Sequence, residues 1–271
     1  MTREGAEATL AAAGAAADER FPLFEAAISC ALHETPGRDP EPARALAGEA
    51  EQRLRARLRR LGPDEAICEA LGMDLRLQGD LLAPDSPDNT DLLSVCERRR
   101  GMSVALGVVF LEAGRRCDVK LAGVDFPGHF LLRVETAEGP MALDPFTGGQ
   151  VVLPSELVRR ALRAGLPPSA ADDLEHLMRP SSPRQVVLRL QAQIYARAVR
   201  AGDFAMAERS ALRRALLDPS DHRPWLDVAT AREGQGRLAG SLEALARAQT
   251  LDGMASLAAR AQRERVRMRL N

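Results

Sequence analysis

The chain has 271 residues, of which 45% are hydrophobic, so it is long enough for two domains and for a sizeable core. Its 37 Lys and Arg residues nearly balance 38 Asp and Glu residues, which gives a net charge of -1. This balance argues against a dedicated binder of nucleic acid or of an anionic membrane. Aromatic residues make up only 3% of the chain, too few for a surface that stacks bases.

The cysteines and histidines are dispersed. Cys30, Cys68, Cys96 and Cys117 show no C-x-x-C spacing, and the histidines do not cluster with them, so we expect no disulfide framework, no metal and no cofactor. The alanine-rich start lacks the apolar core of a secretory signal, and no apolar run approaches the roughly 20 residues of a membrane helix. The sequence therefore predicts a soluble cytoplasmic protein that does not bind membranes.

The first third of the chain has helical patterning. Residues 1–18 are rich in alanine, and we expect a flexible or weakly helical tail there. Over residues 19–83, apolar side chains recur at helical spacing, and the segment 36–42, rich in proline and glycine, separates two stripes. The arginine-rich run 53–60 is interpreted as the solvated face of a helix, because Glu49 and Glu51 lie just before it. An N-terminal helical subdomain is predicted for residues 19–83.

Residues 84–165 form the next predicted domain. A turn-forming cluster ends at Asn89 and Thr90, either of which is suited to N-cap a helix that stops at Gly101. A second helix from Ser103 to Arg116 is apolar nearly all round, so it should be buried.

The pattern then changes to short strands. The predicted strands are Lys120–Asp125, His129–Glu135 and Met141–Asp144, separated by turns that contain glycine and proline. A buried helix followed by an antiparallel meander indicates the α+β fold class.

Residues 180–271 contain an internal repeat. Gly202 recurs as Gly236 and Leu217 as Leu251, each 34 residues apart. A helix–turn–helix period of 34 residues is typical of tetratricopeptide repeats (TPRs), and Trp225 occupies the position where such a repeat usually has a Trp.

The match to a TPR is incomplete, because Val228-Ala229, Arg232 and Gly253 replace residues of the usual pattern. Two ordinary helical hairpins remain the alternative. Residues 254–270 are the expected capping helix. If the repeats are TPRs, their concave surface predicts a protein or peptide as the partner, and no nucleic acid.

Four blocks of the sequence together resemble a known family. They are Asn89 with Leu92-Leu93-Ser94-Val95; Glu97-Arg98-Arg99-Arg100-Gly101; Phe126-Pro127-Gly128-His129-Phe130-Leu131-Leu132-Arg133; and Asp144-Pro145-Phe146-Thr147-Gly148-Gly149. With the helical leader and the repeated tail, the chain after residue 20 resembles the SirB-type transglutaminase-like proteins. That resemblance implies a papain-like core with an antiparallel sheet, followed by C-terminal TPRs.

The resemblance also implies a catalytic arrangement. In active transglutaminase-like enzymes a Cys begins the buried helix, a His starts one strand and an Asp lies on the next strand. His129 matches the His and Asp144 the Asp, whereas the Cys position matches Ser103. Many SirB-type proteins carry Pro at that position, so the loss of the thiol is typical of the family.

Ser103 therefore has two interpretations. Its hydroxyl either N-caps the helix or acts as a nucleophile activated by His129 and oriented by Asp144. His129 and Asp144 are either a structural pair or part of a binding site. Possible polar support comes from Asn89, Arg98, Arg99 and Arg100, and one of these arginines is expected to pair with Glu97 or near Asp144.

Two functions remain open. The first is a non-catalytic transglutaminase-like protein, a pseudoenzyme that serves with its TPRs as a protein-interaction or regulatory module. The second is a peptide-amide hydrolase or acyl-transferase that uses Ser103, His129 and Asp144 in place of the Cys-His-Asp triad.

Overall fold

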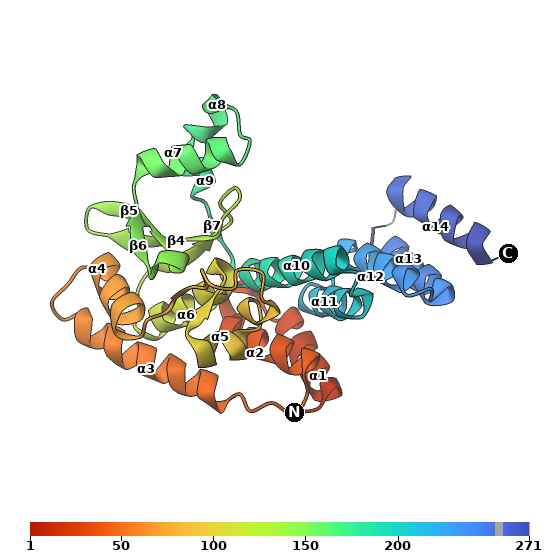
Figure 1. Ribbon diagram of the computed structural model, residues 1–271, viewed down its shortest axis with the longest axis horizontal. Helices are drawn as coiled ribbons and strands as arrows, with labels where there is room; N and C mark the ends of the chain where they lie inside the picture. Colours follow the sequence, from red (N-terminus) through yellow and green to blue (C-terminus); the bar gives the residue numbers. More distant parts are fainter. Residues whose placement is uncertain (253–256, 271) are drawn as a thin grey trace. The chain divides into compact units, whose positions relative to one another are not determined.

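The structure, a computed structural model, describes residues 1–252 and 257–270 (Figure 1). Contacts divide the chain into two units that are interleaved in sequence. The helical unit comprises Met1–Phe21, Ser29–Arg38 and Leu188–Asn271, and the sheet unit comprises Pro22–Ile28 and Asp39–Val187. Among the described residues, no helix has the length and apolar character needed to cross a membrane.

This division differs from the expected boundaries at residues 19, 84 and 180. Helix α2 (Leu23–Glu34) begins in the sheet unit and ends in the helical unit, whereas α3 (Glu41–Arg57) belongs to the sheet unit. The predicted N-terminal helical subdomain is thus shared between the two units.

The predicted N-terminal tail is a packed helix in the structure. Helix α1 (Arg3–Ala15) buries Ala6 and Leu10, and it lies against α11 (Phe204–Leu217) within the helical unit. A Cβ atom on Gly14 would lie 2.0 Å from the backbone oxygen of Leu216, so the two helices approach closely at this glycine. The alanine run that we interpreted as a tail provides the small side chains that such close packing requires.

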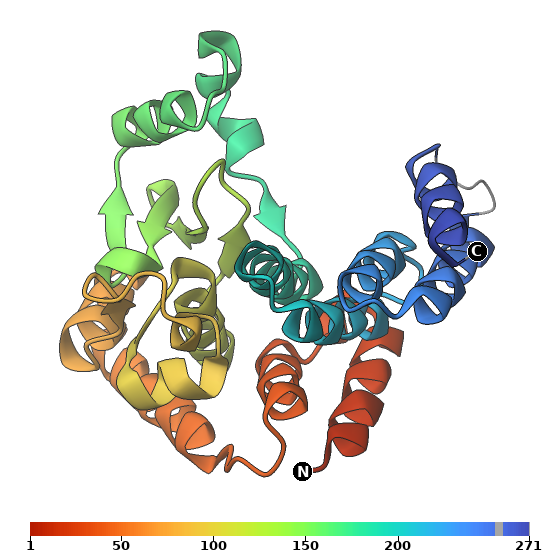
Figure 2. The same cartoon turned by 45° about the vertical axis from the view of Figure 1, so that its right-hand side comes forward.

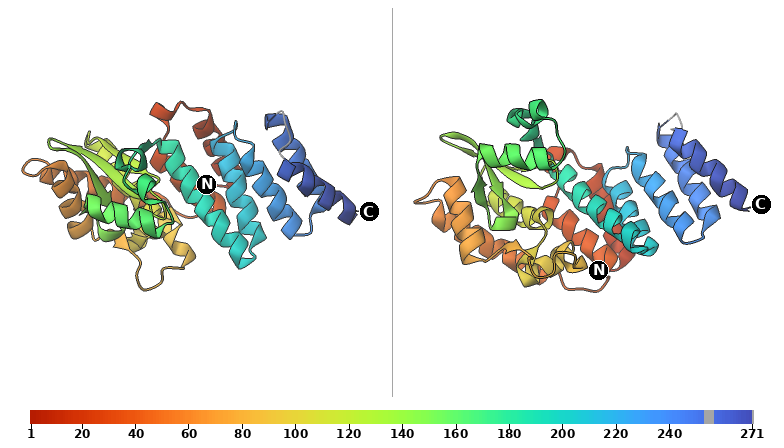
Figure 3. Two further views of the ribbon diagram at one scale, coloured as in Figure 1. Left: turned by 90° about the horizontal axis from the view of Figure 1, so that it is seen from above. Right: turned by 45° about the horizontal axis from the view of Figure 1, so that its top comes forward.

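The remainder of the helical unit is a series of antiparallel helices (Figure 3). They are α10 (Pro183–Ala201), whose first turn belongs to the sheet unit, α11, α12 (Arg223–Gly234), α13 (Leu238–Asp252) and α14 (Leu257–Leu270). Gly202 and Gly236 both have a φ of 72°, in the left-handed region that favours glycine. Gly202 lies in the turn between α10 and α11, and Gly236 lies in the turn between α12 and α13. The 34-residue sequence period is therefore also a period of the backbone. Gly253 and residues 254–256 of the expected capping helix lie outside the described residues.

The sheet unit begins with helices that pack beside a small parallel pairing. After α3 come α4 (Pro63–Ile67), a π-helical segment (Cys68–Asp74), β1 (Gln78–Gly79), α5 (Leu92–Arg98), β2 (Arg100–Gly101) and α6 (Ser103–Arg116). The N-cap of α5 is Asp91, whose carboxylate accepts a hydrogen bond from the Ser94 amide at 2.8 Å. The prediction that Asn89 or Thr90 caps this helix is wrong, because both residues lie in the preceding 3-10 turn and its end.

The larger sheet has five antiparallel strands in the order β6-β5-β4-β3-β7. They are β3 (Leu121–Val124), β4 (Leu131–Thr136), β5 (Gly139–Asp144), β6 (Gln150–Val152) and β7 (Pro180–Ser181). The three strands predicted from the sequence correspond to β3, β4 and β5. The mixed architecture of helices with an antiparallel sheet is thus confirmed.

Helices cover the two faces of this sheet (Figure 2). Helix α6 lies on one face, where Gly107 contacts the ring of Phe130 so closely that a Cβ would lie 2.3 Å from it. On the other face are α7 (Pro154–Arg163), α8 (Pro168–Ala171) and α9 (Leu174–Leu177). Leu157 and Ala161 of α7 pack there with Leu131 and Ala142 of the sheet. Residues of α6 from Val104 to Gly114 are all buried, as the apolar pattern predicts.

Candidate functional site

Antiparallel pairing brings His129 and Asp144 together. Leu132 of β4 pairs with Leu143 of β5, so the start of β4 lies beside the end of β5. His129 lies two residues before β4, in a turn closed by a hydrogen bond from its amide to the Phe126 oxygen at 3.0 Å. Asp144 is the last residue of β5. The sheet register therefore fixes the histidine and the carboxylate on neighbouring strands.

The Asp144 carboxylate has three polar partners. His129 Nε2 lies 2.9 Å from Oδ1, the Phe146 amide donates to the same oxygen at 2.9 Å, and Arg160 Nη1 donates to Oδ2 at 2.8 Å. The Asp144 side chain is 3% exposed, whereas the His129 side chain is 28% exposed. Burial alone would raise the pKa of Asp144, but His129, Arg160 and the Phe146 amide together lower it below its ordinary value. Asp144 is thus a fixed anion under neutral conditions.

Arg160 is the site residue that the sequence analysis missed. It lies on α7, and its Nε also donates to Glu156 Oε1 at 3.1 Å, one helical turn away. The Glu156–Arg160 spacing was the available signal, since residues four apart share a helix face. An arginine of the run 98–100 was expected to pair with Glu97 or near Asp144; the second of these alternatives is wrong, because Arg160 is the guanidinium on that carboxylate.

A cavity of about 450 Å³ opens beside these groups. It is lined by Pro127, Gly128, His129, Asp144, Phe146, Thr147, Glu156, Arg160, Arg163 and Ala164. The rings of His129 and Phe146 meet edge to face, with centroids 6.4 Å apart. The cavity therefore presents an imidazole, two guanidinium groups and two carboxylates to a ligand, with an aromatic wall.

Ser103 lies at the start of α6 but outside that cavity lining. The N-cap of α6 is Met102, without a side-chain cap, so the prediction that the Ser103 hydroxyl caps this helix is wrong. The hydroxyl makes no hydrogen bond to His129 or to any other part of the chain that the structure describes. One turn further along α6, Gly107 contacts the ring of Phe130, the residue after His129.

None of the four cysteines lines the cavity beside His129. Cys96 and Cys30 are buried, and burial raises the pKa of each thiol to about 12. Such thiols are poor sources of thiolate at neutral pH. Within residues 1–252 and 257–270, no group of three or more His, Cys, Asp and Glu side chains is placed to hold a metal ion.

Asn89 and Arg98 belong to a second polar cluster next to the start of α6. The side-chain amide of Asn89 donates from Nδ2 to the backbone oxygen of Ala83 at 2.7 Å, and Arg98 donates to Asn89 Oδ1 at 3.2 Å. Arg98 also pairs with the buried Asp80 carboxylate, and the backbone amide of Met102 donates to the Asn89 oxygen at 3.0 Å. This cluster holds the loop before α6 and does not contact Asp144.

The other two arginines of the run have different surroundings. Arg99 pairs with Glu49 of α3 at 2.9 Å. Arg100 is half-buried in β2 and makes no ion pair with any described residue. The four polar residues proposed as support therefore hold the α5–α6 loop, except Arg100.

Comparisons with known proteins identify relatives of this chain. A family model described as the transglutaminase-like superfamily matches residues 42–192. A UPF0162 protein of Xylella fastidiosa strain Temecula1 is 30% identical over 236 residues, which cover 85% of this chain and 84% of the relative. A UPF0162 protein of Pseudomonas aeruginosa is 31% identical over 212 residues, covering 76% of this chain and 77% of the relative.

A shorter match links the chain to SirB1. Protein SirB1 of Salmonella typhimurium is 42% identical over 55 residues, which cover 20% of each chain. No solved structure matches this chain significantly. The family model spans more than half of the chain, and the UPF0162 relatives extend the similarity over most of its length. The chain therefore belongs to the transglutaminase-like superfamily and is a SirB-type member of it.

Proposed function

We propose that this protein is a non-catalytic transglutaminase-like protein that acts as a protein-interaction or regulatory module in the cytoplasm. One observation carries the proposal: the His129–Asp144 pair is formed, but Ser103, at the expected nucleophile position, makes no hydrogen bond to it, and neither Ser103 nor any cysteine lines the cavity beside His129. A nucleophile needs to be within hydrogen-bond reach of its base for general-base activation. Without that contact the cavity supports binding.

Arg160 strengthens this interpretation. In catalytic triads the carboxylate orients the imidazole and stabilises the imidazolium that forms during the reaction. Here a second cation already shares the Asp144 carboxylate at 2.8 Å, which reduces its capacity to stabilise an imidazolium. Arg160 and Arg163 both already bind Glu156, so the pocket beside His129 is suited to hydrogen-bond an uncharged group such as a backbone carbonyl of a bound segment.

The helical unit is the proposed recruiting surface. We assign its hairpins to tetratricopeptide repeats on the 34-residue period and on the matching glycines Gly202 and Gly236. Stacked repeats of this kind offer an extended surface for a protein or peptide partner.

The alternative is a hydrolase or acyl-transferase that acts on a peptide amide through Ser103. One observation favours it: the Ser103 hydroxyl is not used in capping, and it lies at the positive end of α6. The Ser103 hydroxyl has no hydrogen-bond partner among the described residues of the free protein, and catalytic hydrogen bonds often form or tighten only with substrate bound.

Labelling with a fluorophosphonate probe separates the two functions. We expect no covalent labelling of the purified full chain, and the same absence in the Ser103→Ala variant. An active serine hydrolase labelled in parallel controls the reagent. Labelling of the native chain that is lost in Ser103→Ala would overturn the non-catalytic proposal and establish an activated serine.

A further inference from the structure

Strand β6 forms an open edge of the five-stranded sheet. It pairs with β5 on one side, and within the described residues no strand pairs with its other side. Val151 on this edge is 39% exposed, and Leu153, which follows the strand, is 63% exposed. Natural sheets usually protect an open edge with charged side chains, proline or a bulge. Strand β6 is short, but its three residues carry neither charge nor proline, and no described residue outside β5 hydrogen-bonds to their backbone groups.

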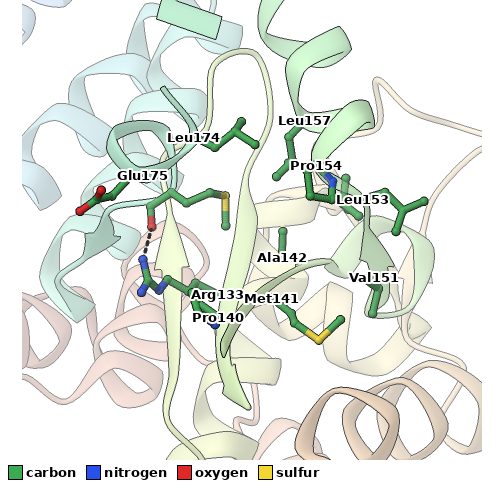
Figure 4. A pocket seen from close by; sticks show the side chains of 12 residues that line it. Arg133, Pro140, Met141, Ala142, Val151, Leu153, Pro154, Leu157, Leu174 and Glu175 are labelled. Carbon is green, nitrogen blue, oxygen red and sulfur yellow. Dashed lines mark hydrogen bonds between the residues drawn. The ribbon is translucent and has the colours of Figure 1, made fainter. Parts of the chain in front are cut away.

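An apolar cavity of about 510 Å³ lies beside this edge, between the sheet and α7–α9 (Figure 4). Most of its lining is aliphatic: Pro140, Met141, Ala142, Val151, Val152, Leu153, Pro154, Leu157, Leu174 and Met178. Arg133 and Glu175 are the charged lining residues. Arg133 Nη1 donates to the Met178 oxygen at 3.4 Å, and its Nε donates to Glu135 at 2.8 Å. The cavity is therefore suited to uncharged aliphatic side chains.

An acidic cavity of about 310 Å³ lies on the α4 side of the same strand. Its lining includes Asp64, Glu65 and Glu69 together with Gln150 and Val151 of β6. Arg57 binds Glu69 at 2.6 Å, but Asp64 and Glu65 make no ion pair with any described residue. Two carboxylates next to the strand therefore lack a cation. Val151 lines both cavities, so β6 is the wall that they share.

We propose that the β6 edge binds an extended peptide segment of a partner protein, whose side chains are alternately aliphatic and basic. The inference deepens the proposed interaction role and rests on it. Main-chain hydrogen bonds to an open edge provide affinity, and alternate side chains point to opposite faces of the added strand. One set would enter the aliphatic cavity, while a Lys or Arg on the other face would meet Asp64 and Glu65.

The position of β6 in the chain connects this edge to the polar site. The strand follows Asp144 by six residues, and α7 begins directly after it and carries Arg160. A bound strand would hold both flanking segments, so the edge and the pocket beside His129 would serve one partner.

Selection from a phage-displayed library of random decapeptides on the purified full chain tests the proposal. We expect enriched peptides to alternate aliphatic residues with Lys or Arg. Fluorescently labelled synthetic versions of the enriched peptides should bind at least tenfold more weakly to Val151→Lys and to Glu65→Lys than to the native chain, as measured by fluorescence anisotropy. Leu162→Lys is the matched control, since Leu162 is 42% exposed on α7 and lines neither cavity. Circular dichroism checks that each variant is folded.

Backbone pairing has its own readout. Bound peptide should slow amide hydrogen exchange in residues 150–152. The proposal is overturned if enriched peptides lack the alternating pattern, or if their binding is equal in Val151→Lys and Leu162→Lys. It is also overturned if no peptide is enriched over a selection on Val151→Lys. A further contrary result is self-association of the native chain that Val151→Lys abolishes, because the occupant of the β6 edge would then be a second copy of the chain. Labelling of Ser103 would overturn the non-catalytic role without changing these peptide results, so the two failures are distinguishable.

Discussion

Each unit of the molecule contains a cluster of histidine, carboxylate and arginine side chains, and the two clusters differ in exposure. In the sheet unit, His129 and Arg160 share Asp144, and His129 borders a cavity. In the helical unit, Arg213 Nη1 pairs with Glu34 at 2.7 Å and lies 3.5 Å from His33 Nδ1. His33 and Arg213 are each 1% exposed.

The contrast shows that these residue types do not by themselves mark a functional site. In the helical cluster Glu34 also binds Arg209, Arg213 also binds Gln191 at 2.7 Å, and His33 binds Glu7 at 3.0 Å. These partners join α1, the end of α2, α10 and α11. The buried cluster thus connects helices, whereas the one beside a cavity can also meet a ligand. Predictions on both clusters test this distinction.

The largest expected effect is that of Glu34→Ala. It leaves the buried Arg213 guanidinium without its carboxylate, and breaking a buried ion pair in this way costs about 3–5 kcal/mol. The loss in free energy of unfolding is measured by urea unfolding, with the fluorescence of Trp225 as the signal. Trp225 is the single Trp of the chain and lies in the helical unit.

Glu243→Ala is the matched control for that measurement, because Glu243 lies in the same unit as Trp225. Glu243 lies 3.8 Å from Arg232 with its side chain 77% exposed, and such surface pairs contribute at most about 1 kcal/mol. Equal losses in the two variants would show that the buried cluster does not stabilise the helical unit.

A smaller effect is expected for Asp144→Asn. His129 and Arg160 lie on different oxygens of the carboxylate, and the amide replaces one of these oxygens with an NH2 group, so one of the two side chains loses its acceptor. Because the Arg160 side chain is 24% exposed and can be hydrated, we expect a loss of about 1–3 kcal/mol. Hydrogen exchange over residues 131–144 measures it, with Glu156→Gln on α7 as the control. An unchanged exchange rate in Asp144→Asn would mean that the carboxylate does not hold the two strands.

Much of the sheet unit was predictable from the sequence, for a physical reason. Alternating short runs and glycine turns specify β3, β4 and β5, and the apolar run from Val104 specifies a buried α6. The pairing of His129 with Asp144 followed from family resemblance and requires only a local register between adjacent strands. Local patterns carry this information because the interacting residues are close in sequence.

The missed features depend on contacts that are distant in sequence. The packing of α1 on α11 joins Gly14 to Leu216, and no local pattern distinguishes an alanine-rich packed helix from an alanine-rich tail. Arg160 was missed because it reaches Asp144 from a separate helix. The cap of α5 was misplaced by one or two residues, since neighbouring Asp, Asn and Thr residues are all common caps, and that of α6 by one residue, because Met102 occupies the N-cap without a side-chain hydrogen bond.

The smallest effect is a pH dependence confined to the helical unit. Burial and the charge of Arg213 lower the pKa of His33 below its ordinary value, and they outweigh the bond to Glu7 that raises it. Below about pH 6.5 the unfolded chain therefore binds a proton at this position more readily than the folded one. Stability should fall as the pH drops below that value, by at most about 1.4 kcal/mol per pH unit.

Urea midpoints from Trp225 fluorescence between pH 7.5 and 5.5 measure this slope, and His33→Gln should flatten it. Asp144 does not contribute in this range, because its pKa is lowered and its stabilisation is lost only as the pH falls below about 4. Equal slopes for the native chain and His33→Gln would contradict the prediction. A slope that His33→Gln removes would show that the buried histidine responds to pH as part of the packing between helices, with no ligand involved.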